Sequence, residues 1–131
     1  MPILTGYVPT PVGEAAFEAS IAEAQRRQLP LVVLNATSGA GTDDRYYADD
    51  ETATRLRSRL EASGLDYQLL RSNSSRDPSE EIIGMAADLH AELIVIGLRP
   101  RTPVGKLILG STAQRVLLDA SCPVLAVKSS D

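Results

Sequence analysis

Residues 77–97, DPSEEIIGMAADLHAELIVIG, decide the fold class. Asp77 is a type of residue that caps helices, Pro78 suits a first helical turn, and a glutamate three residues after the cap completes a capping box. This start predicts a helix from Pro78 to about His90. The continuous apolar run at 93–96 then predicts a buried strand, because a strand covered on both faces is apolar throughout.

The same alternation continues toward both ends of the chain. The predicted strands span residues 3–8, 31–36, 65–70, 93–96 and 123–127. The predicted helices span residues 11–27, 50–62, 78–90 and 111–119. This order predicts an α/β fold in which a five-stranded parallel sheet has helices on both faces and right-handed crossovers. We expect residues 1–131 to form a single domain.

Composition excludes several classes of protein. The 13 Lys and Arg residues are outnumbered by 17 Asp and Glu, and aromatic residues make up 4%. Nucleic-acid binding is therefore not expected, because it needs a basic surface or stacking platforms. No apolar run is long enough for a membrane helix, and no signal peptide is recognisable at the start. The single cysteine, Cys122, fits a reducing compartment, so we expect a cytoplasmic protein.

The segment after the fourth strand has the chemistry of an anion site. Residues 97–116 contain three glycines, four cations and no acid. Glycines let main-chain N–H groups approach an anion, and a helix start adds a positive dipole end. We therefore hypothesise that Gly110, Ser111 and Thr112 hold phosphates and that Gly97 allows the turn out of the strand. The residues leave a plainer alternative open, in which Gly97 is only a turn residue and Ser111 only caps a helix through the capping box STAQ.

The segment 92–128, ELIVIGLRPRTPVGKLILGSTAQRVLLDASCPVLAVK, resembles the C-terminal signature of the universal stress protein (UspA-like) family. The earlier segments ILTGYV and LPLVVLNAT agree with the first two strands of that family. The resemblance implies the strand order 3-2-1-4-5. It also implies a homodimer, often paired through the last strand, here from Pro123 to Val127. Many members bind ATP, and the family has no generally established catalytic activity.

The ATP-binding members carry a glycine motif that this chain matches in part. Gly97 matches its first position, and Gly110 with Ser111 match its last. Pro100 replaces the middle glycine and lacks an N–H that could hold a phosphate. We infer that Arg99 and Arg101 could supply that contact instead.

The resemblance also places the other end of a nucleotide. Binding members hold the ribose with an aspartate near the end of the first strand, where this chain has Val8, followed by Pro9. The adenine contact would fall at Ala36, through main-chain atoms. Val8 cannot accept a hydrogen bond through its side chain, so this chain departs from the family pattern at two positions, Val8 and Pro100.

Two functions from different classes remain open. The first is a regulatory module that binds ATP or a related nucleotide, with or without Mg²⁺. The second is a degenerate member that binds no nucleotide and acts as a dimeric interaction protein in a stress response. An enzyme such as a slow nucleotide hydrolase is a weaker third alternative, because no base and nucleophile are paired in the sequence. No metal site is predicted, since the aspartates at 43–50 lack EF-hand spacing.

Overall fold

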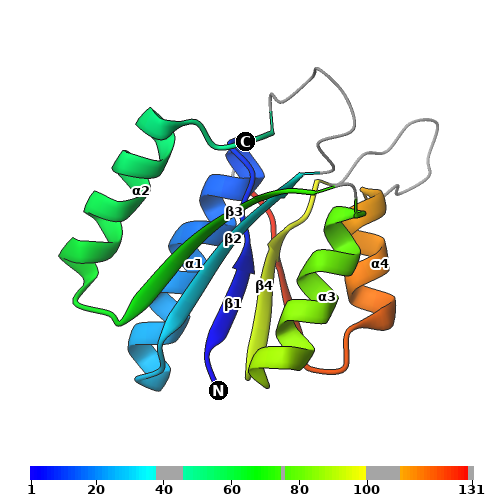
Figure 1. Ribbon diagram of the computed structural model, residues 1–131. Coiled ribbons are helices and arrows are strands. Elements are labelled where there is room, and N and C mark those ends of the chain that lie inside the picture. Colours follow the sequence, from blue (N-terminus) through cyan, green and yellow to red (C-terminus); the bar gives the residue numbers. More distant parts are fainter. Residues whose placement is uncertain (38–45, 75, 100–109, 130–131) are drawn as a thin grey trace.

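The computed structural model of the chain describes residues 1–37, 46–74, 76–99 and 110–129 (Figure 1). Strands and helices alternate along these residues as the sequence predicts. In chain order the elements are β1 (Ile3–Gly6), α1 (Pro11–Arg27), β2 (Leu31–Thr37), α2 (Asp50–Ser63), β3 (Tyr67–Asn73), α3 (Pro78–Leu89), β4 (Leu93–Gly97), α4 (Ser111–Asp119) and β5 (Val124–Val127).

The five strands form one parallel sheet, which confirms the predicted order β3-β2-β1-β4-β5. The central strand β1 pairs with both β2 and β4, so that Leu4 lies opposite Val32 on one side and Ile94 on the other. The chain leaves β1 toward β2 and later returns to the other side of β1 with β4. This reversal makes the carboxyl ends of β1 and β4 the switch point of the sheet, where ligands bind in folds of this kind.

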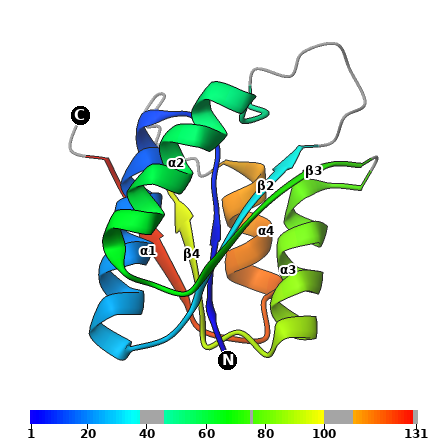
Figure 2. The same ribbon diagram turned by 60° about the vertical axis from the view of Figure 1, so that its left-hand side comes forward.

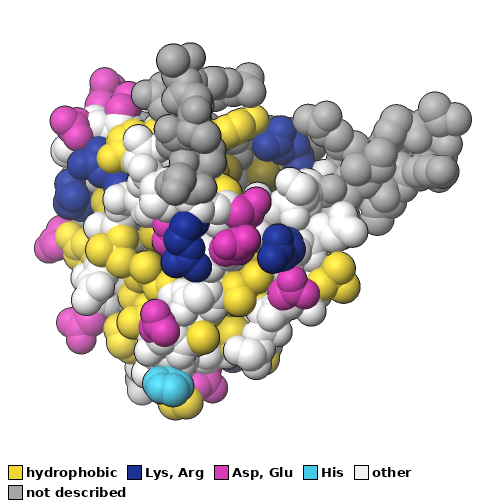
Figure 3. Space-filling view, turned by 45° about the vertical axis from the view of Figure 1, so that its right-hand side comes forward, with side chains coloured by type: hydrophobic (Ala, Val, Ile, Leu, Met, Phe, Trp, Pro, Cys, Tyr) yellow, Lys and Arg dark blue, Asp and Glu magenta, His cyan; other side chains and the backbone are white. Residues whose placement is uncertain are grey.

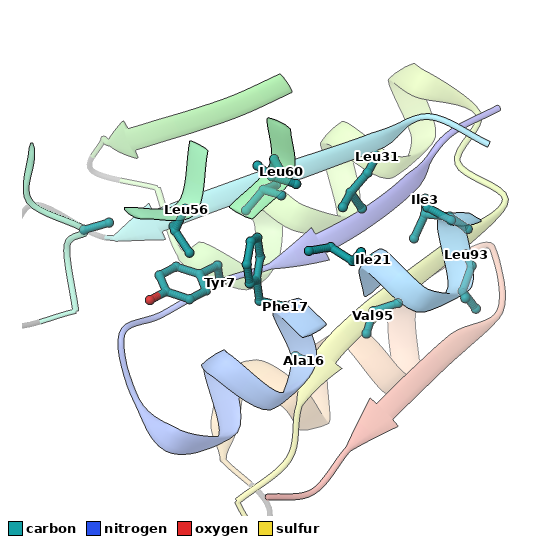
Figure 4. Packing of buried hydrophobic residues seen from close by; sticks show 13 residues of the cluster. Ile3, Tyr7, Ala16, Phe17, Ile21, Leu31, Leu56, Leu60, Leu93 and Val95 are labelled. Carbon is teal, nitrogen blue, oxygen red and sulfur yellow. The ribbon is translucent and has the colours of Figure 1, made fainter. Parts of the chain in front are cut away.

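Helices cover both faces of the sheet, and each face has its own core. Figure 2 shows α1 and α2 on one side of the strands and α3 and α4 on the other. Ile3 of β1 and Tyr7, directly after β1, belong to the core beneath α1 and α2, whereas Leu4 belongs to the core beneath α3 and α4. The first core is drawn in Figure 4. Strands buried on both faces explain why the central apolar runs are continuous rather than alternating.

Three of the four helices begin with a side-chain cap. A side-chain oxygen at the N-cap accepts from a main-chain N–H at Thr10 in α1, Asp49 in α2 and Asp77 in α3. The predicted cap at Ser111 is wrong. The N-cap of α4 is Gly110, Ser111 is already the first helical residue, and no side chain caps the helix. The capping-box pattern was therefore placed one residue too late.

The bounds of two strands differ from the prediction by more than one residue. β1 ends at Gly6 and not at Val8, because the chain turns there and the Thr10 amide donates to the Val8 carbonyl at 2.8 Å. β3 lies two to three residues later than predicted. α2 ends in a left-handed cap at Gly64 with φ of 76°, and the chain needs two further residues before Tyr67 pairs with Leu31.

No helix within the described residues is long and apolar enough to cross a membrane.

Candidate functional site

A cavity of about 320 Å³ lies at the carboxyl edge of the sheet. It is lined by the ends of β1, β2 and β4 and by the first turns of α1, α3 and α4. In Figure 1 these strand ends and the starts of α3 and α4 lie at the upper edge of the sheet. The cavity therefore lies at the switch point, where the topology predicts a ligand site.

Most of the residues predicted for the site line this one cavity. They are Val8, Ala36, Gly97, Arg99, Gly110, Ser111 and Thr112. Pro9 is outside the cavity lining. Arg101 and Pro100 lie outside the described residues, so the contact inferred for Arg101 stays a prediction. The structure thus brings together residues from positions 8 to 112 of the sequence.

The described wall of the cavity is mainly apolar and includes one charged side chain. Apolar side chains come from both the sheet and the helices: Val12, Leu34, Pro78, Ile82, Ile96 and Ala113. Arg99 is the charged side chain among the described lining residues. The space-filling view shows a basic side chain beside apolar surface between the two grey segments (Figure 3). This combination suits a ligand with an apolar body and an anionic end.

Gly97 is required by close packing and not by a turn. It is the last residue of β4, and the positive φ glycine among the described residues is Gly64. A Cβ at Gly97 would lie 2.6 Å from the carbonyl oxygen of Val12, in the first turn of α1. The expectation that Gly97 is needed for the turn out of the strand is therefore wrong. The glycine is needed because the start of α1 lies close against the end of β4.

The N-terminus of α4 is open toward the cavity. The first helical hydrogen bond is donated by Gln114 to the carbonyl of Gly110 at 2.9 Å. The N–H groups of Ser111, Thr112 and Ala113 precede it and have no partner within the helix. All three residues line the cavity, and Arg99 lies on its wall as well. Main-chain donors, a positive helix end and a guanidinium together favour a bound anion.

The loop after β1 is held in one position. The Val8 carbonyl accepts from the Thr10 amide at 2.8 Å, and the Thr10 hydroxyl accepts from the Gly13 amide at 3.1 Å. Gly13 touches the same loop, since a Cβ there would lie 1.8 Å from the Val8 carbonyl oxygen. The half-buried Val8 side chain therefore occupies a fixed place on the cavity wall.

Asn35 joins two parts of the cavity wall from behind the sheet. Its fully buried amide donates to the main-chain oxygens of Tyr7 at 2.8 Å and Tyr46 at 2.9 Å. Its oxygen accepts from the Ala48 amide at 2.8 Å. Tyr7 and Tyr46 both line the cavity. Asn35 thus fixes the end of β1 relative to the segment that precedes α2.

Arg71 holds the same segment from the edge strand β3. It donates to the Ala48 carbonyl at 3.1 Å and to the Asp50 carboxylate at 2.9 Å, and its guanidinium lies 5.7 Å from the ring centroid of Tyr47. The position of Tyr46 on the cavity wall is therefore set by contacts from two neighbouring strands.

The Tyr7 hydroxyl points away from the cavity, toward α1 and α2. It donates to the Glu14 carboxylate, which also forms an ion pair with Arg55 at 2.6 Å. The ring packs edge-on against Phe17, with 5.9 Å between centroids (Figure 4). Burial raises the pKa of the Tyr7 phenol, and the hydrogen bond to Glu14 adds to the shift. Tyr7 therefore stays neutral and ties the end of β1 to both helices.

Other candidate residues lie away from the cavity. His90 is the left-handed C-cap of α3, with φ of 51°. Burial raises the pKa of the half-buried Cys122 thiol, so it is not an activated nucleophile. Asp49 caps α2, and Asp50 pairs with Arg71. In the part of the chain that the structure describes, no three His, Cys, Asp or Glu side chains are grouped as metal ligands.

Sequence reasoning missed the apolar and aromatic parts of the wall. Tyr46, Leu34 and Ile82 line the cavity but were not among the residues predicted for the site. Leu34 lies two residues before Ala36 on the same face of β2, so strand alternation could have added it. Ile82 lies one turn into α3, and its pattern is the same as that of any core residue. No sequence signal separates it from the core.

Comparison with known proteins agrees with the fold. The family model for the universal stress protein family matches residues 1–128. A universal stress protein of Mycolicibacterium smegmatis is 44% identical over 126 residues, which are 96% of this chain and 96% of that protein.

Two solved structures are similar over nearly the whole chain. The structure of a universal stress protein from Archaeoglobus fulgidus has a TM-score of 0.80 and 30% identity, covering 98% of both chains. A second one, from the same organism in complex with dAMP, has a TM-score of 0.73 and 24% identity, again covering 98% of both chains. The family match and the relative from Mycolicibacterium carry the assignment: the chain belongs to the universal stress protein family.

Proposed function

We propose that the cavity binds ATP or a related adenine nucleotide and that the protein is a small regulatory module of the stress response. The observation that carries the proposal is the meeting of an open helix N-terminus, a guanidinium and an apolar wall in one cavity at the switch point. The phosphates are placed at the start of α4 and the base at the end of β2.

The phosphate end is supported by the contrast between α4 and the other helices. In α1, α2 and α3 a side-chain oxygen already satisfies an N-terminal amide. In α4 the cap is Gly110, which brings no side chain, and no atom of the described residues lies within 4 Å of the place where its Cβ would stand. Space and donors are thus present together, and Arg99 adds charge.

The base end is supported by the shape and polarity of the wall near β2. Leu34 and Ala36 offer an apolar surface, and Tyr46 lies beside them on the lining. A planar base is recognised by apolar contact and main-chain hydrogen bonds in sites of this type. The dAMP complex from Archaeoglobus is an example of an adenine nucleotide in a protein of this fold. At 24% identity it supports the fold, and the proposal for this chain depends on the cavity itself.

The first experiment is direct. The protein is purified without added nucleotide and denatured, and any released small molecule is identified by mass spectrometry. Calorimetric titration with ATP follows, with and without Mg²⁺, and ADP release is measured in the same samples. The proposal expects a co-purified nucleotide or a Kd tighter than about 100 μM, which is about −5.5 kcal/mol. If no ligand is released and the titration gives no heat of binding, the proposal is overturned.

Variants locate the site. Gly110→Val with Ser111→Ala is expected to abolish binding and leave the fold intact, because a Cβ at 110 meets none of the described residues within 4 Å. Arg99→Gln should weaken binding about tenfold, in line with the loss of one charge-assisted contact. The matched control is Arg115→Gln, an exposed cation of α4 that pairs with Asp119 and is outside the lining. Equal effects of the two arginine variants would place the ligand elsewhere.

A dimeric interaction protein is the second candidate, and the exposed leucines favour it. β5 is an edge strand, and an unpaired edge is open to another chain. Leu125 on β5 is 36% exposed, and Leu117 and Leu118 on α4 are 39% and 74% exposed. We propose a homodimer through the last strand, Val124–Val127, with Leu125 in the interface. This surface can operate with or without a nucleotide.

The two edges of the sheet offer a matched test. Leu125→Lys on β5 should shift the mass measured by light scattering toward the monomer. Leu70→Lys on the opposite edge strand β3 is the control, because Leu70 is also 36% exposed. Circular dichroism checks that both variants are folded. A Leu125→Lys protein that stays dimeric would place the interface on another surface.

A further inference from the structure

The middle of the cavity lies at the end of β1, between the proposed phosphate end and the proposed base end. In a nucleotide bound in that orientation, the sugar lies here. The lining residues of this part are Gly6, Tyr7, Val8, Val12 and Gly13. Tyr7 alone among them has a polar side-chain atom, and its hydroxyl is bonded to Glu14.

The polar side chains nearest to this wall are engaged elsewhere. The Thr10 hydroxyl accepts from the Gly13 amide as the cap of α1. The Thr5 hydroxyl donates to the Val95 carbonyl at 2.9 Å, within the sheet. The Tyr7 hydroxyl lies on the far side of the strand, against α1 and α2. Thr5 and Thr10 are outside the cavity lining, and the Tyr7 hydroxyl is bonded to both Glu14 and Arg55.

The Asn35 amide is also committed. It is fully buried, and both its nitrogen and its oxygen are bonded to main-chain groups. Among the described residues, no buried side-chain nitrogen or oxygen lacks a hydrogen-bond partner. In the part of the chain that the structure describes, no buried side chain therefore offers an unpaired nitrogen or oxygen to a sugar hydroxyl.

Val8 stands where such a partner could be placed. Its side chain is half-buried on the cavity wall, and its main chain is fixed by the Thr10 amide and by contact with Gly13. A carboxylate at this position would accept hydrogen bonds from the sugar hydroxyls, as an acidic side chain does for the ribose 2′-hydroxyl in dinucleotide-binding folds. A site built to bond a hydroxyl rejects the analogue without it, whereas an apolar wall gives no such advantage to the hydroxyl.

We infer that Val8 is a specificity-determining residue and that the cavity binds 2′-deoxyribonucleotides at least as tightly as ribonucleotides. The inference depends on the proposed function, because it needs a nucleotide in the orientation given above. It goes further because it states that the site does not favour ligands that carry a 2′-hydroxyl.

Calorimetric titration with AMP and with dAMP tests it on the full chain. The wild-type protein is expected to bind dAMP with a Kd equal to or lower than that for AMP. Val8→Asp should reverse the order, so that AMP binds at least tenfold more tightly than dAMP. Val8→Asn should shift the ratio in the same direction without adding a charge near the phosphate. Val8→Ile, the apolar control, should keep the wild-type ratio.

The outcomes separate this inference from the proposed function. A wild-type protein that binds AMP more than threefold more tightly than dAMP overturns the inference and leaves nucleotide binding in place. An unchanged ratio in folded Val8→Asp and Val8→Asn proteins also overturns it. No binding of either nucleotide overturns the proposed function and the inference together.

Discussion

The end of β4 and the start of α4 each bring a glycine to the cavity, and the two glycines have different physical causes. At Gly97 a Cβ would lie 2.6 Å from the Val12 carbonyl oxygen, whereas at Gly110 it would meet none of the described residues within 4 Å. The first glycine is needed to bring α1 against β4. The second gives α4 an N-cap without a side chain. Packing therefore explains the glycine at 97, and no packing contact of a described residue explains the one at 110.

The largest expected effect is a loss of stability on substitution of Gly97. Gly97→Ala forces a methyl group against the main chain of Val12, which cannot move away as a flexible side chain could. We expect the free energy of unfolding to fall by about 3 kcal/mol, at the upper end of overpacking costs. Urea denaturation measures it. A loss below about 1 kcal/mol would show that α1 can shift and that the close approach is not required.

The comparison also shows why part of the site could be predicted and part could not. The alternation of apolar runs with capped helices gave the element order, since both patterns are local. The resemblance supplied the strand order and the residues at the strand ends, such as Val8 and Ala36. The reason for Gly97 is a contact with Val12, which is distant in the sequence. A spacing rule finds the glycine but not its cause.

At the start of α4 the local sequence rule itself made a wrong prediction. Ser111 is a common N-cap residue, and with Gln114 it forms a capping-box pattern, so the local rule predicted a cap there. The helix begins at Ser111 itself, and Gly110 is the N-cap. With this cap the third helical residue is Ala113 and not Gln114, so the helix does not use the capping box. The difference matters because a serine cap would occupy the donors that the open helix offers to an anion.

The next largest effect should come from closing the open end. Gly110→Asp would give α4 the kind of cap that Asp77 gives α3, and its carboxylate would repel phosphate. We expect nucleotide affinity to fall at least about 30-fold, or ~2 kcal/mol, while stability rises slightly. Gly110→Ala is the control, since its methyl group has room and no charge. Unchanged affinity in Gly110→Asp would remove α4 from the site.

A smaller effect is expected at the capped neighbour. Asp77→Ala leaves the N-terminus of α3 without the oxygen that accepts from the Ser79 amide at 2.8 Å. The free energy of unfolding should fall by about 1 kcal/mol, while Asp77→Asn should keep most of the cap. Urea denaturation of the three proteins measures the difference. If Asp77→Ala is as stable as the wild type, α3 does not depend on its side-chain cap. The difference between the caps of α3 and α4 would then have no effect on stability.

The smallest effect is a pH dependence that α3 has and the wild-type start of α4 lacks. The Ser79 hydroxyl and amide both donate to the Asp77 carboxylate and lower its pKa below the ordinary value of about 3.9. Because the folded pKa is the lower one, this stabilisation is present above the unfolded pKa and is lost as the pH falls through the folded pKa. The stability difference between wild type and Asp77→Asn should therefore be constant near neutral pH and change below about pH 4.

Urea denaturation of both proteins between neutral pH and the lowest pH at which they fold measures this difference. Gly110→Asp sharpens the comparison, because it should give α4 an acid-sensitive cap of the same kind. That variant should then lose its added stability over the same range, whereas Gly110→Ala should not. A difference between wild type and Asp77→Asn that is independent of pH would mean that the charge of Asp77 is immaterial. The open end of α4 would then differ from α3 only in its free donors, and charge repulsion would have to be tested by nucleotide binding alone.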